Sequence, residues 1–185
     1  MLRAEKGVAV TFELAIPSPD DPRWTRRDGI LVRRGQGITT WVQGDTTTVK
    51  LTAAQTNGAL GVLETVVNPG SGAIPHAHGR EEEAFYVLSG DFDFVNGDQT
   101  FRAGPGDLIF IPRGNRHGFT NIGALPATLL TFMFPAGHEQ FWIDNGENPT
   151  PGGRPPAWGP DKLAEVAAEL ARHHVTVMPQ QPTTG

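Results

Sequence analysis

Short segments rich in β-branched and aromatic residues follow one another through the middle of the chain, and turn-forming residues separate them. Segments of this kind predict strands, which we expect at residues 46–54, 60–67, 84–88, 92–95, 100–102, 108–111, 117–120 and 127–134. The pair Asn96-Gly97 lies between two alternating segments and is typical of a tight β-hairpin. Short strands with turns about every eight to twelve residues predict an all-β antiparallel sandwich or barrel.

The two ends of the chain lack this strand pattern. Residues 1–45 contain a proline-rich run and predict an N-terminal arm that packs on a barrel of residues 46–135. Residues 136–185 predict a C-terminal extension with a short helix at 138–145, a Pro/Gly linker at 148–158, a final helix from 160 to about 173 and a strand-like segment at 175–178. The final helix has one apolar face, made by Leu163, Val166, Ala167 and Leu170. We expect the extension to pack on the outer face of the barrel.

Composition narrows the class of protein. The 23 glycines and 16 prolines fit a fold with many turns. A net charge of −5 without a run of lysine or arginine argues against a nucleic-acid partner. The lack of cysteine excludes thiolate zinc sites, iron–sulfur clusters and a cysteine nucleophile. Because no segment reads as a signal peptide or a membrane helix, we expect a cytoplasmic protein with no membrane partner.

Three of the six histidines lie where they could share a metal ion with one glutamate. His76 and His78 are two residues apart, which places them on the same face of a strand. Glu83 follows shortly after, and His117 belongs to a later segment. Imidazole and carboxylate ligands suit a divalent first-row transition metal, whether Fe, Ni, Mn, Co, Cu or Zn. The other interpretation is two core histidines and a solvated strand glutamate.

The spacing of these residues with glycine, proline and asparagine follows two motifs. The first runs Gly70, His76, His78, Glu83 and Gly90, and the second runs Gly106, Pro112, Gly114, His117 and Asn121. In both motifs the chain resembles the cupin family. The resemblance implies a double-stranded β-helix, or jelly-roll barrel, in which His76, His78, Glu83 and His117 are the metal ligands.

Other polar residues near the motifs have simpler interpretations. The neighbouring Glu81 and Glu82 are expected as exposed charges at the rim, because the motif spacing selects Glu83 as the ligand. His138 is expected at the surface, and Asn121 is expected to secure a turn.

Strand alternation predicts the walls of a substrate pocket. If Glu83 points inward, Phe85 and Val87 do so too, and an inward His117 implies an inward Phe119. Further walls are expected from Phe132 or Met133 and from Phe141 or Trp142. Such a pocket would take an apolar or aromatic substrate that chelates the metal, although the phenylalanines could equally be ordinary barrel core.

The extension resembles that of single-domain cupins of the quercetinase-like group. This resemblance rests on residues 136–142, the pair Pro155-Pro156 and the helix at 161–172. It implies the chemistry of quercetin 2,3-dioxygenase, an oxidoreductase: a flavonol hydroxyl binds the metal, Glu83 acts as the base, and dioxygen cleaves the heterocycle.

Two other functions fit the same ligands. One is a non-redox metalloenzyme of the polyketide cyclase or isomerase type, in which the metal acts as a Lewis acid. The other is a cupin that binds a small molecule without turnover. By analogy with cupins that pair through their sheets, we also expect a homodimer.

Overall fold

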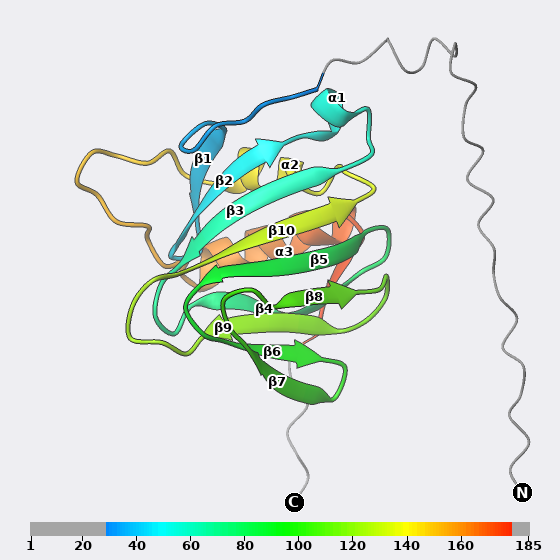
Figure 1. Ribbon diagram of the computed structural model, residues 1–185, viewed down its shortest axis with the longest axis vertical. Helices are drawn as coiled ribbons and strands as arrows, with labels where there is room; N and C mark the ends of the chain where they lie inside the picture. The colour runs from blue at the N-terminus through cyan, green and yellow to red at the C-terminus, as the bar shows by residue number, and fades with distance from the viewer. Residues whose placement is uncertain (1–28, 179–185) are drawn as a thin grey trace, which may run out of the picture. The chain divides into compact units, whose positions relative to one another are not determined.

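Two antiparallel sheets form the body of the protein (Figure 1). The computed structural model describes residues 29–178. One sheet has six strands in the order β1 (Ile38–Val42), β2 (Asp45–Leu51), β3 (Gly61–Val67), β10 (Ala127–Phe134), β5 (Glu82–Ser89) and β8 (Leu108–Ile111). The other has five, in the order β11 (Val175–Val177), β4 (Gly72–His78), β9 (His117–Asn121), β6 (Phe92–Asn96) and β7 (Gln99–Ala103). The predicted all-β jelly-roll class is confirmed.

Every strand predicted in the barrel is present, and the strand bounds differ from the prediction by a few residues. β2 ends at Leu51 rather than residue 54 because Thr52 caps the short helix α1 (Ala53–Thr56). The Thr52 backbone N–H donates to Gln55 Oε1 at 3.0 Å, one half of a capping box. Thr52 therefore ends a β-branched run that sequence pattern alone would continue as a strand.

The predicted hairpin joins β6 to β7, and its turn lies one residue later than the Asn96-Gly97 signal. Asn96 pairs with Gln99, so the two turn residues are Gly97 and Asp98. Gly97 has φ +60°, which a glycine adopts at little cost.

Two strands of the structure were not predicted. β1 lies within residues 1–45, which were expected as an arm, and it pairs with β2 through a turn at Gln43 and Gly44. Both turn residues have positive φ, 50° and 87°. β4 contains Pro75 and only isolated apolar residues, so it lacks a continuous strand signal. Residues 1–28 of the expected arm lie outside the described residues, and its packing on the barrel stays a prediction.

The inner faces of the two sheets form the core. Along β10, residues alternate strictly between buried and half-buried, so Leu129, Thr131 and Met133 point inward. Aromatic rings fill one part of the interior, where Phe94 lies 5.4 Å from Phe85 and 5.5 Å from Phe119 between ring centroids. Burial of each such ring contributes about 1.5–3 kcal/mol. The part of the interior that these rings do not fill contains the polar side chains described in the next subsection.

The C-terminal extension contains α2 (Gln140–Asn145), α3 (Pro160–Arg172) and β11, close to the predicted bounds. Pro160 occupies the first turn of α3, and β11 adds to the edge of β4. The apolar face of α3 lines the same cavity as Phe85 and Phe119 of the barrel and does not pack on the barrel's outer face, so the expected placement of the extension was wrong. The physical reason is that the cavity would otherwise expose its apolar walls. None of the helices between residues 29 and 178 has the length and apolar composition needed to cross a bilayer.

Candidate metal centre

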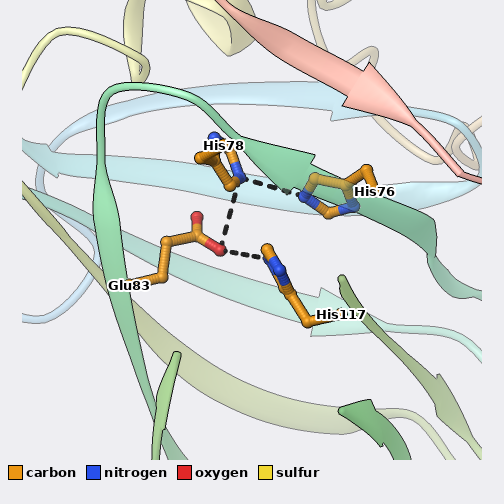
Figure 2. A group of neighbouring side chains, drawn as sticks. All are labelled: His76, His78, Glu83 and His117. Atoms are coloured by element: carbon orange, nitrogen blue, oxygen red, sulfur yellow. Dashed lines mark hydrogen bonds and ion pairs between the residues drawn. The ribbon is translucent and has the colours of Figure 1, made fainter. Parts of the chain in front are cut away.

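Three imidazoles and one carboxylate converge inside the barrel, as Figure 2 shows. β4 supplies His76 and His78, β5 supplies Glu83, and β9 supplies His117. β4 and β9 are paired, with His76 directly opposite His117. One potential ligand atom from each of the four side chains lies within 4.8 Å of the others. The structure thus brings together the four residues expected as ligands.

The shortest distances all involve the atoms that face the centre. His117 Nε2 lies 2.8 Å from Glu83 Oε2, and His78 Nε2 lies 3.4 Å from the same oxygen. His76 Nε2 lies 3.0 Å from His78 Nε2. Three ring nitrogens and one carboxylate oxygen therefore surround one point.

Backbone carbonyls fix the orientation of two of the rings. His76 Nδ1 donates to the carbonyl of Ile74 at 2.7 Å, and His117 Nδ1 donates to the carbonyl of Asn115 at 3.0 Å. A carbonyl only accepts, so Nδ1 carries the proton, and in the neutral ring Nε2 offers its lone pair to the centre. Protein metal ligands are commonly oriented in this way.

The protonation states of the cluster also suit a cation. Burial lowers the pKa of His76 to about 3, and the neighbouring His117 adds to this effect. Burial opposes the charge of Glu83, but His78 and His117 hold the pKa of its carboxyl well below the usual value. Burial also opposes a charge on His78, but Glu83 and Glu81 raise its pKa to about 9. Without a metal, the His78 proton is the positive charge that these groups share.

A divalent first-row metal fits this donor set. The lone pair of His76 Nε2 faces His78 Nε2 at 3.0 Å, a distance that either a proton on His78 Nε2 or a metal ion bound by both nitrogens would satisfy. A metal ion in place of the His78 proton would satisfy both nitrogens and the carboxylate. Nitrogen and oxygen ligands without sulfur do not select among the first-row metals.

Glu81 is buried, with 3% of its surface exposed, so its expected place at the rim was wrong. Its Oε2 lies 3.6 Å from His78 Nδ1, and neither atom has a hydrogen-bond partner among the described residues. Glu81 lies in the turn between β4 and β5, and this turn places its carboxylate next to the outer nitrogen of His78. Its position three residues after a ligand histidine was the only sequence signal for this role.

A cavity of about 350 Å³ adjoins the cluster and reaches His76 and Glu83. Of the residues expected in a substrate pocket, Phe85, Phe119, Phe141 and Trp142 line it. The other lining residues are mostly apolar, with some polar side chains: Val42, Gln43, Asp45, Thr47, Thr65, Gly72, Ala73, Ile74, Thr131, His138, Trp158, Leu163, Val166, Ala167, Leu170, Val175 and Val177.

Three residues expected in the pocket do not line this cavity. Val87 is fully buried in the aromatic core. Met133 packs with Val49 and Leu63 in a second core cluster. Phe132 lies on the opposite face of β10 from these inward positions, because alternate residues of a strand face opposite sides.

Two polar residues at the cavity were missed by sequence reasoning. His138 was expected at the surface, but only 3% of it is exposed, and its ring centroid lies 4.8 Å from that of His78. In the helix predicted at 138–145, His138 lies three residues before Phe141 and therefore on the same side, which was the available sequence signal.

Asp45 accepts hydrogen bonds from Asn68 N at 2.9 Å and Ser71 Oγ at 2.8 Å. Burial outweighs these bonds and raises the pKa of Asp45 to about 6.

Asn121 secures a turn, as expected. Its side-chain amide donates to the carbonyls of Val67 and Leu125, each at 2.9 Å, and its Oδ1 accepts from Gly123 N at 2.9 Å. These bonds fix the connection that leads from β9 to β10.

Comparison with known proteins gives both sequence and structural likenesses. A family model described as Cupin domain matches residues 63–133, which include all four clustered residues. Tetracenomycin polyketide synthase protein TcmJ of Streptomyces glaucescens is 30% identical over 123 residues, which are 63% of this chain and 80% of TcmJ. Protein SchB of Streptomyces halstedii is 36% identical over 84 residues, which are 45% of this chain. Uncharacterized protein MJ1618 of Methanocaldococcus jannaschii is 33% identical over 74 residues, which are 40% of this chain. The chain spans 59% of the length of SchB and of MJ1618.

Solved structures show the same fold at lower sequence identity. KdgF from Halomonas sp. superposes with a TM-score of 0.55 at 18% identity, over 61% of this chain and 99% of that chain. An RmlC-like cupin from Shewanella frigidimarina gives a TM-score of 0.53 at 19% identity, over 61% of this chain and 96% of that chain.

Proposed function

The chain belongs to the cupin superfamily, and on this premise we propose that it is a metal-dependent enzyme for an apolar aromatic or enol molecule that chelates the metal. One observation carries the proposal. The ligand cluster opens, through His76 and Glu83, onto a cavity whose walls are mainly apolar and aromatic. Its volume of about 350 Å³ lies within the usual range for small-molecule sites.

One set of residues would hold the metal, and another set encloses the space for the substrate. His76, His78, Glu83 and His117 would hold the metal, which when bound supplies Lewis-acid polarisation of a substrate oxygen. Glu83 is both a member of the cluster and a lining residue, so its carboxylate could accept the proton of an enol hydroxyl of a bound substrate.

The aromatic side chains make up much of the enclosure. Phe85, Phe119, Phe141 and Trp142 line the cavity and would pack on the faces of a planar substrate. They also keep water away from the centre, which strengthens the electrostatic interactions of the charged groups there.

We place a non-redox reaction of the polyketide type first. The support is that the relative aligned over the largest share of this chain among those named above is a polyketide synthase protein. Poly-β-ketone chains are enolisable chelators, and their ring closure forms a carbon–carbon bond with loss of one water molecule. That reaction needs a base to form the enol of the substrate and a cation to polarise the carbonyl that the enol attacks. Glu83 could act as the base, and the cluster could hold a metal ion that would polarise the carbonyl.

A dioxygenase of the quercetinase-like group is the second candidate. The observation that favours it is the layout of the extension, where α2, a Pro-rich segment and α3 follow in the order on which the resemblance rests. In that reaction Glu83 would deprotonate the flavonol, and dioxygen would be the co-substrate.

Metal analysis combined with two assays separates the candidates. The purified protein is expected to hold one metal ion per chain. We would measure dioxygen uptake with quercetin, and we would follow ring closure of an aryl 1,3,5-triketone by absorbance and mass spectrometry. Metal-dependent ring closure without dioxygen uptake is the expected result, and dioxygen uptake matched to quercetin loss would instead establish the second candidate.

Glu83→Gln and its neighbour Glu82→Gln form a matched pair for these assays. Glu83→Gln should abolish turnover, whereas Glu82→Gln should leave it intact, because Glu82 is not part of the cluster. A metal-loaded protein that binds both probes and turns over neither would be a binding protein, and the enzyme proposal would be wrong.

A further inference from the structure

His138 is a buried imidazole beside the metal centre that does not belong to the ligand cluster. Its ring centroid lies 4.8 Å from that of His78, 5.6 Å from that of Phe141 and 5.1 Å from that of Trp142. It lines the same cavity as His76 and Glu83. The group of four converging side chains does not include it.

Its position is fixed by the residue that follows it. Both carboxylate oxygens of Glu139 accept backbone hydrogen bonds, Oε1 from Ala53 N at 2.5 Å and Oε2 from Gly137 N at 2.6 Å. Ala136 N donates to the carbonyl of Gly58 at 3.0 Å. Glu139 is itself 2% exposed, so these bonds clamp the segment against α1 from inside the protein. His138 is therefore held at the cavity wall before any ligand arrives.

One ring nitrogen of His138 lacks a hydrogen-bond partner among the described residues. A neutral imidazole has one donor and one acceptor nitrogen. Nδ1 has no hydrogen-bond partner within residues 29–178. A buried polar atom without a partner weakens the folded state, and a phenylalanine would fill the same aromatic contacts without that cost.

We propose that His138 binds a polar atom of the substrate, so that the site selects chelating molecules that carry a hydrogen-bonding oxygen or nitrogen next to the metal-bound end. This inference rests on the proposed function, because the molecule selected is the chelating substrate. The cavity around His138 is otherwise formed largely by aromatic and aliphatic side chains. A single hydrogen bond in such surroundings discriminates strongly, since water does not compete for it.

The test compares variants of the full-length protein loaded with one equivalent of Zn²⁺, which does not react with dioxygen. The probe is 3,5-dihydroxyflavone, a planar chelator whose 5-hydroxyl stays free next to the metal-bound end, and the shift of its absorbance reports binding. His138→Phe keeps the aromatic contacts and removes both nitrogens, whereas His138→Gln keeps a donor and an acceptor. The control is His173→Gln, because His173 lies 5.6 Å from His138 between ring centroids and does not line the cavity. Zinc content and the midpoint of thermal unfolding are measured for every variant.

His138→Phe is expected to bind 3,5-dihydroxyflavone about tenfold more weakly than the parent protein, with the zinc content unchanged and the midpoint unchanged or higher. His138→Gln should recover part of the affinity, and His173→Gln should bind as the parent does. Equal affinity in His138→Phe at full zinc content would overturn the proposal and leave His138 a packing residue. Loss of zinc from His138→Phe would overturn it as well, since His138 would then be a metal ligand. A parent protein that neither holds zinc nor binds the probe would refute the proposed function itself.

Discussion

Glu81 has the position from which a carboxylate can orient a metal-binding imidazole. Its Oε2 lies 3.6 Å from His78 Nδ1, the nitrogen that faces away from the centre. Nδ1 of each of the other two cluster imidazoles donates to a backbone carbonyl, so His78 is the one whose outer nitrogen faces a carboxylate. A carboxylate in this position raises the basicity of the ring and holds its orientation.

Glu81→Gln is expected to weaken metal affinity by about 10- to 100-fold, the usual effect of losing such a partner. The fold should persist, because Oε2 of Glu81 makes no hydrogen bond to any of the described residues. Competition with a zinc-binding dye measures the affinity. Glu82→Gln is the control, and a Glu81→Gln protein with the parent's affinity would show that Glu81 does not act on His78.

The stability of the metal-free protein should vary with pH in two opposite ways. His76 and His138 have pKa values of about 3 when folded and about 6.5 when unfolded. Between these values the unfolded chain binds more protons, so stability falls as the pH drops from 6.5 towards 3. His78 has a raised pKa of about 9, so its contribution is complete below pH 6.5 and is lost as the pH rises to 9.

Thermal midpoints of chelator-treated protein between pH 4 and pH 9.5 check this expectation, with a maximum near pH 6.5. Bound zinc should remove the alkaline decline, because the metal replaces the proton of His78. A midpoint that stays level from pH 6.5 to 9 without metal would contradict the expected state of His78.

At the residue level, sequence predicted the cluster but not its surroundings. The two cupin-like motifs hold His76, His78, Glu83 and His117 at spacings that identify them. Glu81 and His138 belong to no motif, and each is buried only because a turn or an extension folds back on the barrel. Such contacts depend on tertiary structure, which local spacing does not encode.

The extension is the element that closes the cavity. The apolar face of α3 lines it with Leu163, Val166, Ala167 and Leu170. Val166 is the buried residue of this helix, with 4% of its surface exposed. The ligand cluster lies on β4, β5 and β9, so α3 contributes to enclosure and not to metal binding.

Val166→Asp should place a charge in the apolar interface and release α3 from the barrel, at a cost on the order of 3 kcal/mol. We expect weaker binding of 3,5-dihydroxyflavone at unchanged zinc content. Glu165→Asp is the adjacent control, because the Glu165 side chain is 67% exposed. Parent-like probe binding in Val166→Asp would show that α3 is not needed for enclosure.

The helical periodicity of α3 predicted the helix and its apolar face, but not the surface that this face covers. Periodicity indicates that one face of a helix is buried, but it does not indicate which surface that face packs against. The edge strand β1 and the strand β4, which lies between β11 and β9, were missed for a different reason. Their sequences contain threonine, proline and glycine instead of a continuous apolar run, and they form strands because neighbouring strands pair with them.

On the scale of the whole molecule, the outer face of the six-stranded sheet carries exposed apolar side chains. Leu108 is 67% exposed and Phe110 is 53% exposed on β8, while the alternate residues of that strand are buried in the core. Tyr86 pairs with Leu108, and Phe110 stacks on Phe134 with ring centroids 6.2 Å apart. An apolar face of this kind favours an interface with a second copy of the chain.

We expect a homodimer that the double substitution Leu108→Glu and Phe110→Lys converts to a monomer with the same zinc content. Light scattering after size-exclusion chromatography measures the mass. Leu125→Glu is the control, since Leu125 is 76% exposed in the turn before β10. If the parent protein already elutes as a monomer, this face has another role.

The pairing of β11 with β4 also bears on how the protein is made. Val175 lies opposite His78 and Val177 lies opposite His76, so the strand with two metal ligands gains this neighbour from the far end of the chain. During synthesis on the ribosome, all four ligand residues emerge well before β11 does. At that stage β4, with His76 and His78, has no β11 beside it, and the edge that β11 later covers is open to water. β11 and α3 then pack beside a cluster whose four residues have already emerged.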